Sequence, residues 1–329
     1  MSDVPLLQVT DLVKHFPIKS GVLVDREVAR VRAVDGVSLT LGDGETLGLV
    51  GESGCGKSTV CRAIMQLVAP TSGSVLFAGE ELVGRSAREM RPLRRQIQMI
   101  FQDPFASLNP RKRIGQIVGD PLVLHGVAKG SEVKPRVQEL LERVGLQAEH
   151  YNRYPHEFSG GQRQRIGIAR AIALNPRLVI ADEPVSALDV SVQAQILNLL
   201  ADLQRDLGLT YVFIAHDLAV VRQVSDRVAV MYLGRIVEIG PALEVCDRPA
   251  HHYTNALLSA VPIPEVSGIR TRERIILRGD VPSLATPPTG CAFHPRCAAA
   301  TDLCARERPA LVPRASGAEG HAVACHHPI

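Results

Sequence analysis

Short apolar runs alternate with polar, glycine-containing stretches through most of the chain. Short apolar or alternating runs bounded by turn residues are typical of strands, and longer runs with helical spacing are typical of helices. Helices are predicted from Thr59 to about Leu67, from Ser159 to Leu174, and from Ser186–Asp189 to about Gln204. Strands are predicted at residues 6–10, 33–41, 46–50, 73–79, 97–101, 178–181, 211–215, 228–232 and 235–238. This alternation of strands and helices predicts an α/β fold.

The pattern changes between residues 105 and 165, where no alternating strands occur. Val137, Leu140, Leu141 and Val144 follow the i, i+3, i+4, i+7 spacing of one helix face. We therefore predict a helical subdomain at about 103–165 inside a nucleotide-binding domain at 1–250. Residues 251–329 are left as a C-terminal domain, whose stretch 261–290 is rich in Pro, Gly and charge and is expected to be an extended linker.

Composition narrows the class of protein only a little. Charged residues make up 22% of the 329 residues, and the formal net charge is +3, so the total gives no reason to expect nucleic acid as a partner. No apolar run approaches the length that spans a bilayer. The stretch from Met1 to Pro5 lacks a basic region followed by an apolar one, so we expect a cytoplasmic protein.

A glycine-rich turn lies between the predicted strand 46–50 and the helix that follows it. Strand, glycine turn and helix form the context of a phosphate-binding loop, because the turn's N–H groups and the helix dipole attract an anion. Lys57 would reach the β- and γ-phosphates, and the Ser58 hydroxyl would bind Mg²⁺. The turn consists of Gly51, Glu52, Ser53, Gly54, Cys55, Gly56, Lys57, Ser58 and Thr59.

Polar residues follow three other predicted strands. Gln102 ends the strand 97–101, where its amide could meet a metal ion or an attacking water. Asp182 and Glu183 follow the strand 178–181; an adjacent acid pair is often a solvated turn, but here Asp182 suits Mg²⁺ and Glu183 could deprotonate water. His216 could contact a γ-phosphate or merely cap its strand. Phe16 could stack on a base or belong to the core, and we place it between the first two predicted strands.

A second candidate anion site lies at Ser159, Gly160, Gly161 and Gln162. Ser159 is a suitable N-cap, and two glycines at a helix start leave backbone N–H groups accessible, although a capped helix start needs no ligand. Two such sites about a hundred residues apart suggest nucleotide sites that are shared between subunits.

In order and spacing, these motifs resemble those of an ABC-transporter ATP-binding subunit over about residues 5–250. The resemblance implies a RecA-like P-loop core with an antiparallel β subdomain and a helical subdomain. It implies that Phe16 stacks on adenine, Gly51–Thr59 is the Walker A loop and Ser159–Gln162 is the signature motif, although Phe158 replaces the usual leucine before it. Ser58, Gln102 and Asp182 would bind Mg²⁺, Glu183 would be the catalytic base, Asp189 would belong to the D-loop and His216 would be the switch histidine.

The same resemblance implies a mechanism and a set of partners. Two such domains dimerise head to tail, ATP closes the dimer, and hydrolysis reopens it. The segments Phe101–Arg111, Tyr154–Phe158, Pro184–Ser191 and His252–Leu258 are similar to those of peptide-importer ATPases, most closely the F-type subunit. This implies a D-type ATPase partner, two permease subunits, an extracytoplasmic peptide-binding protein and a peripheral position on the cytoplasmic face of the membrane.

Three other functions fit part of the pattern. Nickel importers share much of it, so the substrate stays open. A soluble ABC-type ATPase acting on nucleic acid or ribosomes would usually carry two cores or a long coiled-coil insertion, and this chain shows neither pattern. An exporter ATPase would leave the cysteine-rich tail unexplained.

Four of the seven cysteines lie near the C-terminal end of the sequence. Cys291, Cys297, Cys304 and Cys325 have five, six and twenty residues between them, which fits a zinc knuckle poorly. Four thiolates on longer loops could hold a [4Fe–4S] cluster; zinc, with His294, His321, His326 or His327 as substitute ligands, or free thiols are the alternatives. The arrangement Gly290–Cys297 resembles the C-terminal region of peptide-importer ATPases, some of which hold such a cluster.

Overall fold

The computed structural model describes residues 4–20, 26–186, 188–260, 275–314 and 317–329. Residues 1–3, residues 261–274 of the predicted linker and Ala187 of the 186–189 motif lie outside these ranges. The chain forms two compact units. Unit 1 comprises Met1–Gly42, Thr46–Gly84 and Ala215–Ile329, and unit 2 comprises Asp43–Glu45 and Arg85–Ile214.

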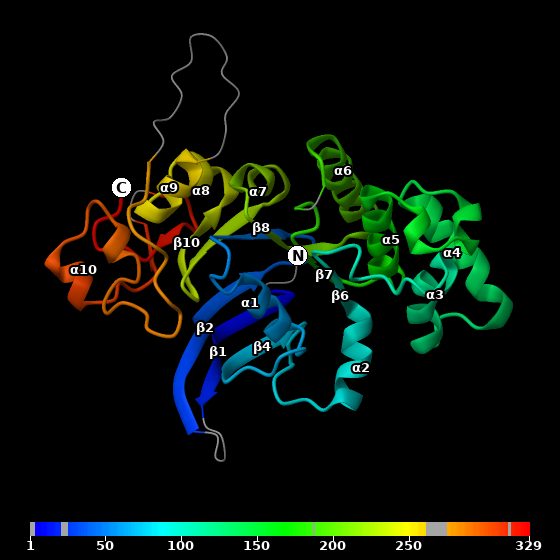
Figure 1. Cartoon of the computed structure of the whole chain (residues 1–329), viewed down its shortest axis with the longest axis horizontal. Helices are drawn as coiled ribbons and strands as arrows, with labels where there is room; N and C mark the ends of the chain where they lie inside the picture. Colours follow the sequence, from blue (N-terminus) through cyan, green and yellow to red (C-terminus); the bar gives the residue numbers. More distant parts are fainter. Residues whose placement is uncertain (1–3, 21–25, 187, 261–274, 315–316) are drawn as a thin grey trace, which may run out of the picture. The chain divides into compact units, whose positions relative to one another are not determined.

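Unit 1 contains an antiparallel sheet in the order β2-β1-β4-β5, whose first three strands lie side by side in Figure 1. Its strands are β1 (Leu7–Ser20), β2 (Arg26–Leu41), β4 (Ser72–Phe77) and β5 (Glu80–Glu81). The first two strands are much longer than predicted because they pair with each other along nearly their whole length, with several register shifts. Phe16 consequently lies within β1, opposite Val31, so its predicted place between the strands is wrong.

Unit 1 also contributes the consecutive sheet strands β11-β12-β10-β9-β3. β3 is parallel to β9, and the other pairs are antiparallel. Helix α7 packs so closely on β3 that an added Cβ at Gly48 would lie 2.0 Å from Val221 Cγ1. The strands are β3 (Thr46–Val50), β9 (Arg227–Tyr232), β10 (Arg235–Pro241), β11 (Val312–Pro313) and β12 (Ala322–Val323). The helices are α1 (Lys57–Ile64), α7 (Leu218–Val224), α8 (Ala242–Asp247), α9 (His252–Ser259), the 3-10 helix η4 (His294–Arg296) and α10 (Asp302–Arg306).

The tail joins unit 1 through a buried polar contact. Strand β12 pairs with β10, and His321 Nε2 lies 2.8 Å from Glu238 Oε1, with both side chains fully buried. Glu238 also accepts hydrogen bonds from the N–H groups of Ala250 and His251. A buried carboxylate with three partners is satisfied, so this contact ties the tail, β10 and the start of α9 together.

Unit 2 contains a parallel sheet in the order β8-β7-β6 and a group of helices. The described residues between β6 and β7 contain helices and no strand, and α3, α4 and α5 contact one another (Figure 1). Its strands are β6 (Ile97–Ile100), β7 (Leu178–Asp182) and β8 (Thr210–Ala215), whose last residue is assigned to unit 1. Its helices are α2 (Ala87–Gln96), α3 (Ile114–Leu124), η1 (Gly130–Glu132), α4 (Val133–Arg143), η2 (Ala148–Asn152), η3 (Pro155–Glu157), α5 (Gly160–Ile172) and α6 (Val190–Leu207).

Candidate active site

The phosphate-binding loop joins the fully buried strand β3 to α1, as the sequence predicts. Gly56 is the N-cap residue of α1, with φ at 109°. A Cβ at Gly56 would lie 2.0 Å from the carbonyl oxygen of Ala33, so both the backbone angle and the close approach require glycine. Gly56 therefore lets the loop lead directly into the first turn of α1, where the backbone N–H groups and the helix dipole favour an anion.

Lys57 is folded back over this loop. Its side chain is buried, and its Nζ donates hydrogen bonds to the carbonyl oxygens of Gly51 at 2.7 Å and Glu52 at 3.0 Å. These two carbonyls hold the ammonium group of Lys57 against the loop.

Asp182 and Glu183 lie at the end of β7 and are almost fully buried. Glu183 has φ at 49°, a left-handed conformation that is costly for a residue with a side chain. Its N–H donates to the carbonyl of Ile214 at 3.1 Å, which holds the residue there. Gln102, which follows β6, donates from Nε2 to Glu183 Oε2 at 2.6 Å. The structure thus brings together two predicted site residues that are 81 positions apart.

The predicted second anion site opens α5. Ser159 is its N-cap, and its Oγ accepts a hydrogen bond from the N–H of Gln162 at 3.4 Å, which confirms the predicted cap. A Cβ at Gly161 would lie 2.5 Å from Val192 Cγ1 in α6, so this glycine allows the two helices to pack closely. Asp189 caps α6 by accepting from the N–H of Val192, and this hydrogen bond lowers the pKa of Asp189.

Two further predicted residues lie in unit 1. His216 follows β8 and is exposed. The Phe16 side chain is 38% exposed, and Lys14 Nζ lies 4.9 Å from the centre of its ring. The predicted residues therefore form two groups. Unit 1 holds the phosphate loop, Phe16 and His216, whereas unit 2 holds Gln102, Asp182, Glu183, Ser159–Gln162 and Asp189.

The four tail cysteines line one small cavity of about 10 Å³. Burial raises the pKa of Cys291 and Cys297, and it raises the pKa of Cys325 to about 11. Each sulfur also has a polar partner. These partners are the backbone N–H groups of Phe293 and His294 for Cys291, of Ala299 for Cys297 and of His327 for Cys325, and the hydroxyl of Thr301 for Cys304.

Among the residues that the structure describes, no group of three or more His, Cys, Asp or Glu side chains is placed to hold a metal ion. The predicted [4Fe–4S] cluster and the alternative zinc site are therefore not supported. The four histidines named as substitute zinc ligands each have a partner within the protein. His294 contacts the carbonyl of Cys291, His321 contacts Glu238, His326 contacts the carbonyl of Glu307, and His327 contacts Thr301.

Sequence reasoning missed two side chains that hold the phosphate loop. Arg296 forms an ion pair with Glu52, and the Tyr253 hydroxyl accepts a hydrogen bond from the Glu52 N–H at 2.8 Å. The signal was present: Arg296 lies in the quoted Gly290–Cys297 arrangement, and Tyr253 lies in the quoted segment His252–Leu258. Neither arrangement points to a partner about two hundred positions earlier in the chain.

Comparison with known proteins shows the class of protein to which this chain belongs. The family described as "ABC transporter" matches residues 34–186, and the family described as "Oligopeptide/dipeptide transporter, C-terminal region" matches residues 237–304. Among solved structures, the chain is similar to a dimeric structure of the ATP-binding cassette MJ0796 in a post-hydrolysis state bound to ADP and Pi. The identity is 30% and the TM-score 0.64, over 72% of this chain and 98% of that one. A second similar structure is cbiO1 from Clostridium perfringens, part of an ABC transporter complex, with 28% identity and a TM-score of 0.62 over 74% of this chain and 91% of that one.

The chain therefore belongs to the ABC-type ATPases with the P-loop fold that serve as ATP-binding proteins of ABC transporters. It is 54% identical over 322 residues to the oligopeptide transport ATP-binding protein AppF of Bacillus subtilis, covering 98% of this chain and 97% of that protein. It is 50% identical over 322 residues to the di/tripeptide transport ATP-binding protein DppF of Pseudomonas aeruginosa, with the same coverage. Within its class the chain belongs to the family of oligopeptide and dipeptide transporter ATP-binding proteins.

A search of the described helices for one that could cross a lipid bilayer, judged by length and apolar character, finds none.

Proposed function

We propose that this chain is the ATP-hydrolysing subunit of an importer of dipeptides and oligopeptides. The observation that carries the proposal is the phosphate loop, in which Gly56 allows the turn and Lys57 is held above it. The names of the relatives, which are peptide transport ATP-binding proteins, supply the class of substrate. ATP bound at the loop would favour the closed state of a dimer, and hydrolysis would release it.

We propose a role in ATP binding and hydrolysis for the residues of each group. Lys57 would bind the β- and γ-phosphates, and Phe16 would stack on the adenine ring. Ser58, Gln102 and Asp182 would bind Mg²⁺, which would neutralise charge on the phosphates. Magnesium prefers oxygen ligands. Asp182 offers a buried carboxylate, Ser58 a hydroxyl and Gln102 an amide oxygen.

Glu183 is the proposed general base. Its carboxylate is buried and oriented by the hydrogen bond from Gln102, so one oxygen is fixed by the protein. A fixed carboxylate beside the γ-phosphate can accept the proton of the attacking water. The exposed His216 would contact the γ-phosphate from the end of β8.

The start of α5 is proposed to bind the ATP of a partner subunit. Gly160 and Gly161 are only partly buried, and Ser159 caps the helix. Asp189, at the start of α6, would belong to the same contact. We propose a D-type ATPase as that partner, two permease subunits and an extracytoplasmic peptide-binding protein in the full system, and a peripheral position on the cytoplasmic face of the membrane.

The four tail thiols are proposed to hold a [4Fe–4S] cluster with a structural role. Support comes from the common cavity that the four cysteines line, because a cluster of this kind is held by four cysteine thiolates. Anaerobic purification with iron and sulfide analysis tests this, with Cys304→Ser as the variant that should lose iron. A colourless protein with stoichiometric zinc would contradict it.

The ATP site is tested by measuring nucleotide binding of Lys57→Ala. We expect at least a tenfold loss of ATP affinity, because a charge-assisted contact to phosphate is removed. Lys112→Ala is the matched control, since this lysine forms an exposed ion pair with Asp120. Unchanged ATP binding by Lys57→Ala would refute the assignment. Uptake of labelled dipeptides by the reconstituted transporter tests the substrate, and uptake of nickel instead would favour the alternative importer.

A further inference from the structure

An ion pair connects the cysteine segment of the tail to the phosphate loop. Arg296 donates from Nη1 to Glu52 Oε2 at 2.8 Å and from Nη2 to Glu52 Oε1 at 3.1 Å. The side chain of Arg296 is 8% exposed and that of Glu52 is 24% exposed. A two-pronged pair that is largely shielded from water is stronger and more directional than an ordinary surface ion pair.

Every polar group of Glu52 is engaged. Its carboxylate binds Arg296, and its N–H donates to the hydroxyl of Tyr253. Its carbonyl accepts from the N–H of Cys55 at 3.2 Å and from Lys57 Nζ at 3.0 Å. Glu52 is therefore where the loop is attached both to its own lysine and to groups outside the loop.

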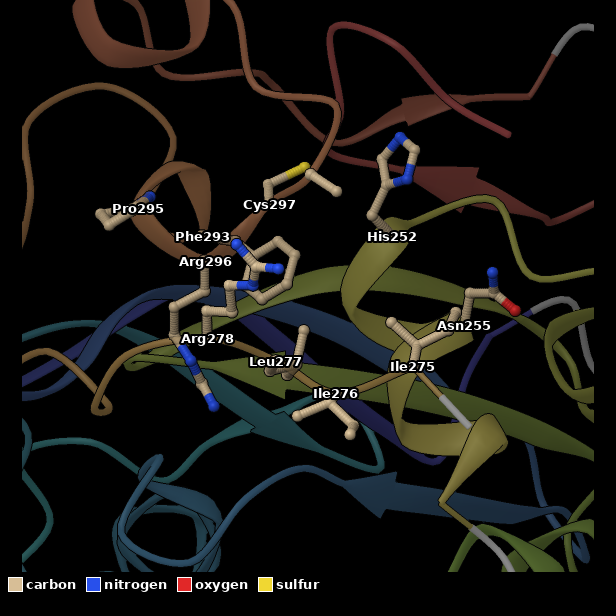
Figure 2. A pocket seen from close by; sticks show the side chains of 11 residues that line it. His252, Asn255, Ile275, Ile276, Leu277, Arg278, Phe293, Pro295, Arg296 and Cys297 are labelled. Carbon is tan, nitrogen blue, oxygen red and sulfur yellow. The ribbon is translucent and has the colours of Figure 1, made fainter. Parts of the chain in front are cut away.

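Arg296 is in turn fixed by its surroundings. It is the last residue of η4 and directly precedes Cys297. Phe293, at the other side of the turn, is buried against Tyr232 and Tyr253, with ring centres 5.3 Å and 5.4 Å away. Figure 2 shows Phe293, Arg296 and Cys297 on the wall of one pocket, which has a volume of about 420 Å³. Movement of the cysteine segment would therefore displace the guanidinium group.

The charge of Arg296 is permanent under all relevant conditions. Its hydrogen bond to Glu52 is the main factor that raises the pKa of Arg296 above its ordinary value. The strength of the Arg296–Glu52 ion pair therefore depends on where the cysteine segment places Arg296 and not on protonation of the arginine.

We propose that Arg296 is a positioning residue for the phosphate loop, and that it couples ATP binding to the order of the cysteine segment 291–297. The inference rests on the proposed binding of ATP at Lys57. The carbonyl of Glu52 accepts a hydrogen bond from Lys57. If Arg296 no longer held Glu52, the loop would hold its N–H groups and Lys57 in less favourable positions for binding phosphate.

The test is equilibrium binding of ATP to the full chain, below the temperature at which any variant unfolds. Arg296→Gln and Glu52→Gln are each expected to raise the Kd for ATP about threefold to tenfold, and the double variant no further, because both remove the same contact. Arg306→Gln is the matched control, since this arginine pairs with Asp302 in an exposed helix of the same tail. Its Kd is expected to equal that of the wild type.

Conservative and coupled variants separate positioning from folding. Arg296→Lys keeps the positive charge but cannot form two parallel hydrogen bonds to Glu52, so its Kd for ATP is expected between those of the wild type and Arg296→Gln. It replaces Arg296→Gln in the test if that variant does not fold. Cys297→Ser is expected to weaken ATP binding in the wild type but to add little in the Arg296→Gln background.

The outcomes are distinguishable. If the wild type binds no ATP, the proposed function and this inference fail together. If the wild type binds ATP and loses it in Lys57→Ala, while Arg296→Gln binds as well as the wild type, only the inference is overturned. Independent, additive losses in the double variant, or equal effects of Cys297→Ser in both backgrounds, would also overturn it.

Discussion

Gln102 and Glu183 meet through a hydrogen bond of 2.6 Å, although they follow different strands of the parallel sheet in unit 2. β6 and β7 are adjacent and parallel, so their carboxyl ends lie at the same edge of the sheet. The bond uses one oxygen of Glu183, and the left-handed backbone at this residue sets the direction of its side chain. This pairing holds the buried carboxylate of Glu183 in one orientation.

Glu183→Gln is expected to lower ATP turnover by at least about 100-fold, because the amide cannot accept a proton from water. ATP binding should be retained, since the substitution leaves the phosphate loop intact, and the variant should accumulate as a closed dimer. Steady-state hydrolysis, ATP binding and size-exclusion chromatography with ATP measure these effects. Asp202→Asn, which removes an exposed acid of α6, is the control. Near-normal hydrolysis by Glu183→Gln would show that another group is the base.

Two glycines of the phosphate loop form a matched pair for substitution. Gly54 and Gly56 both have positive φ, but a Cβ at Gly54 would meet no atom within 4 Å, whereas one at Gly56 would lie 2.0 Å from the Ala33 carbonyl oxygen. Gly54→Ala should cost only the backbone strain, about 1 kcal/mol of folding free energy. Gly56→Ala must also displace a strand and should abolish ATP binding. Nucleotide binding and urea unfolding of both variants would reveal the contrast, and equal behaviour would contradict it.

Features that depend on a few neighbouring residues could be predicted from the sequence. The apolar run before the phosphate loop and the cap Ser159 are encoded within a few residues, and the structure confirms both. Contacts between distant positions were not accessible in this way. Arg296 meets Glu52 across 244 positions, and neither residue follows a periodic pattern that would indicate the other.

Other features depend on tertiary context. The left-handed backbone of Glu183 is held by a hydrogen bond to Ile214, so nothing in the local sequence predicts it. Phe16 was misplaced for a similar reason, because pairing with β2 extends β1 through a stretch with no clear alternation.

Glu238→Ala is expected to destabilise the protein by about 3–5 kcal/mol, because it leaves His321 and two backbone N–H groups buried without their acceptor. The control is Glu244→Ala, whose contact with Arg248 is 3.9 Å long and involves an arginine side chain that is 76% exposed, and which should cost no more than about 1 kcal/mol. Urea unfolding measures both free energies. Similar losses in the two variants would mean that the buried pair does not hold the tail to β10.

His251 should make stability depend on pH. Burial lowers the pKa of His251 to about 4, opposed by the nearby charge of Glu238 and assisted by that of His252. Its Nδ1 accepts a hydrogen bond from the Tyr253 N–H at 3.0 Å, which requires that nitrogen to be unprotonated. An unfolded histidine has a pKa of about 6.5, so between about pH 6.5 and pH 4 the unfolded state binds the proton and the folded state does not.

The free energy of unfolding should therefore fall as the pH is lowered through this window, by up to about 3 kcal/mol from this residue, and the loss should level off below pH 4. His251→Asn keeps an acceptor at the N-cap of α9 but does not titrate, so its stability should change less steeply between pH 7 and pH 4.5. Urea unfolding at several pH values measures the slopes. His156→Asn, at an exposed histidine, should keep the wild-type slope, and an unchanged slope in His251→Asn would show that other groups cause the pH dependence.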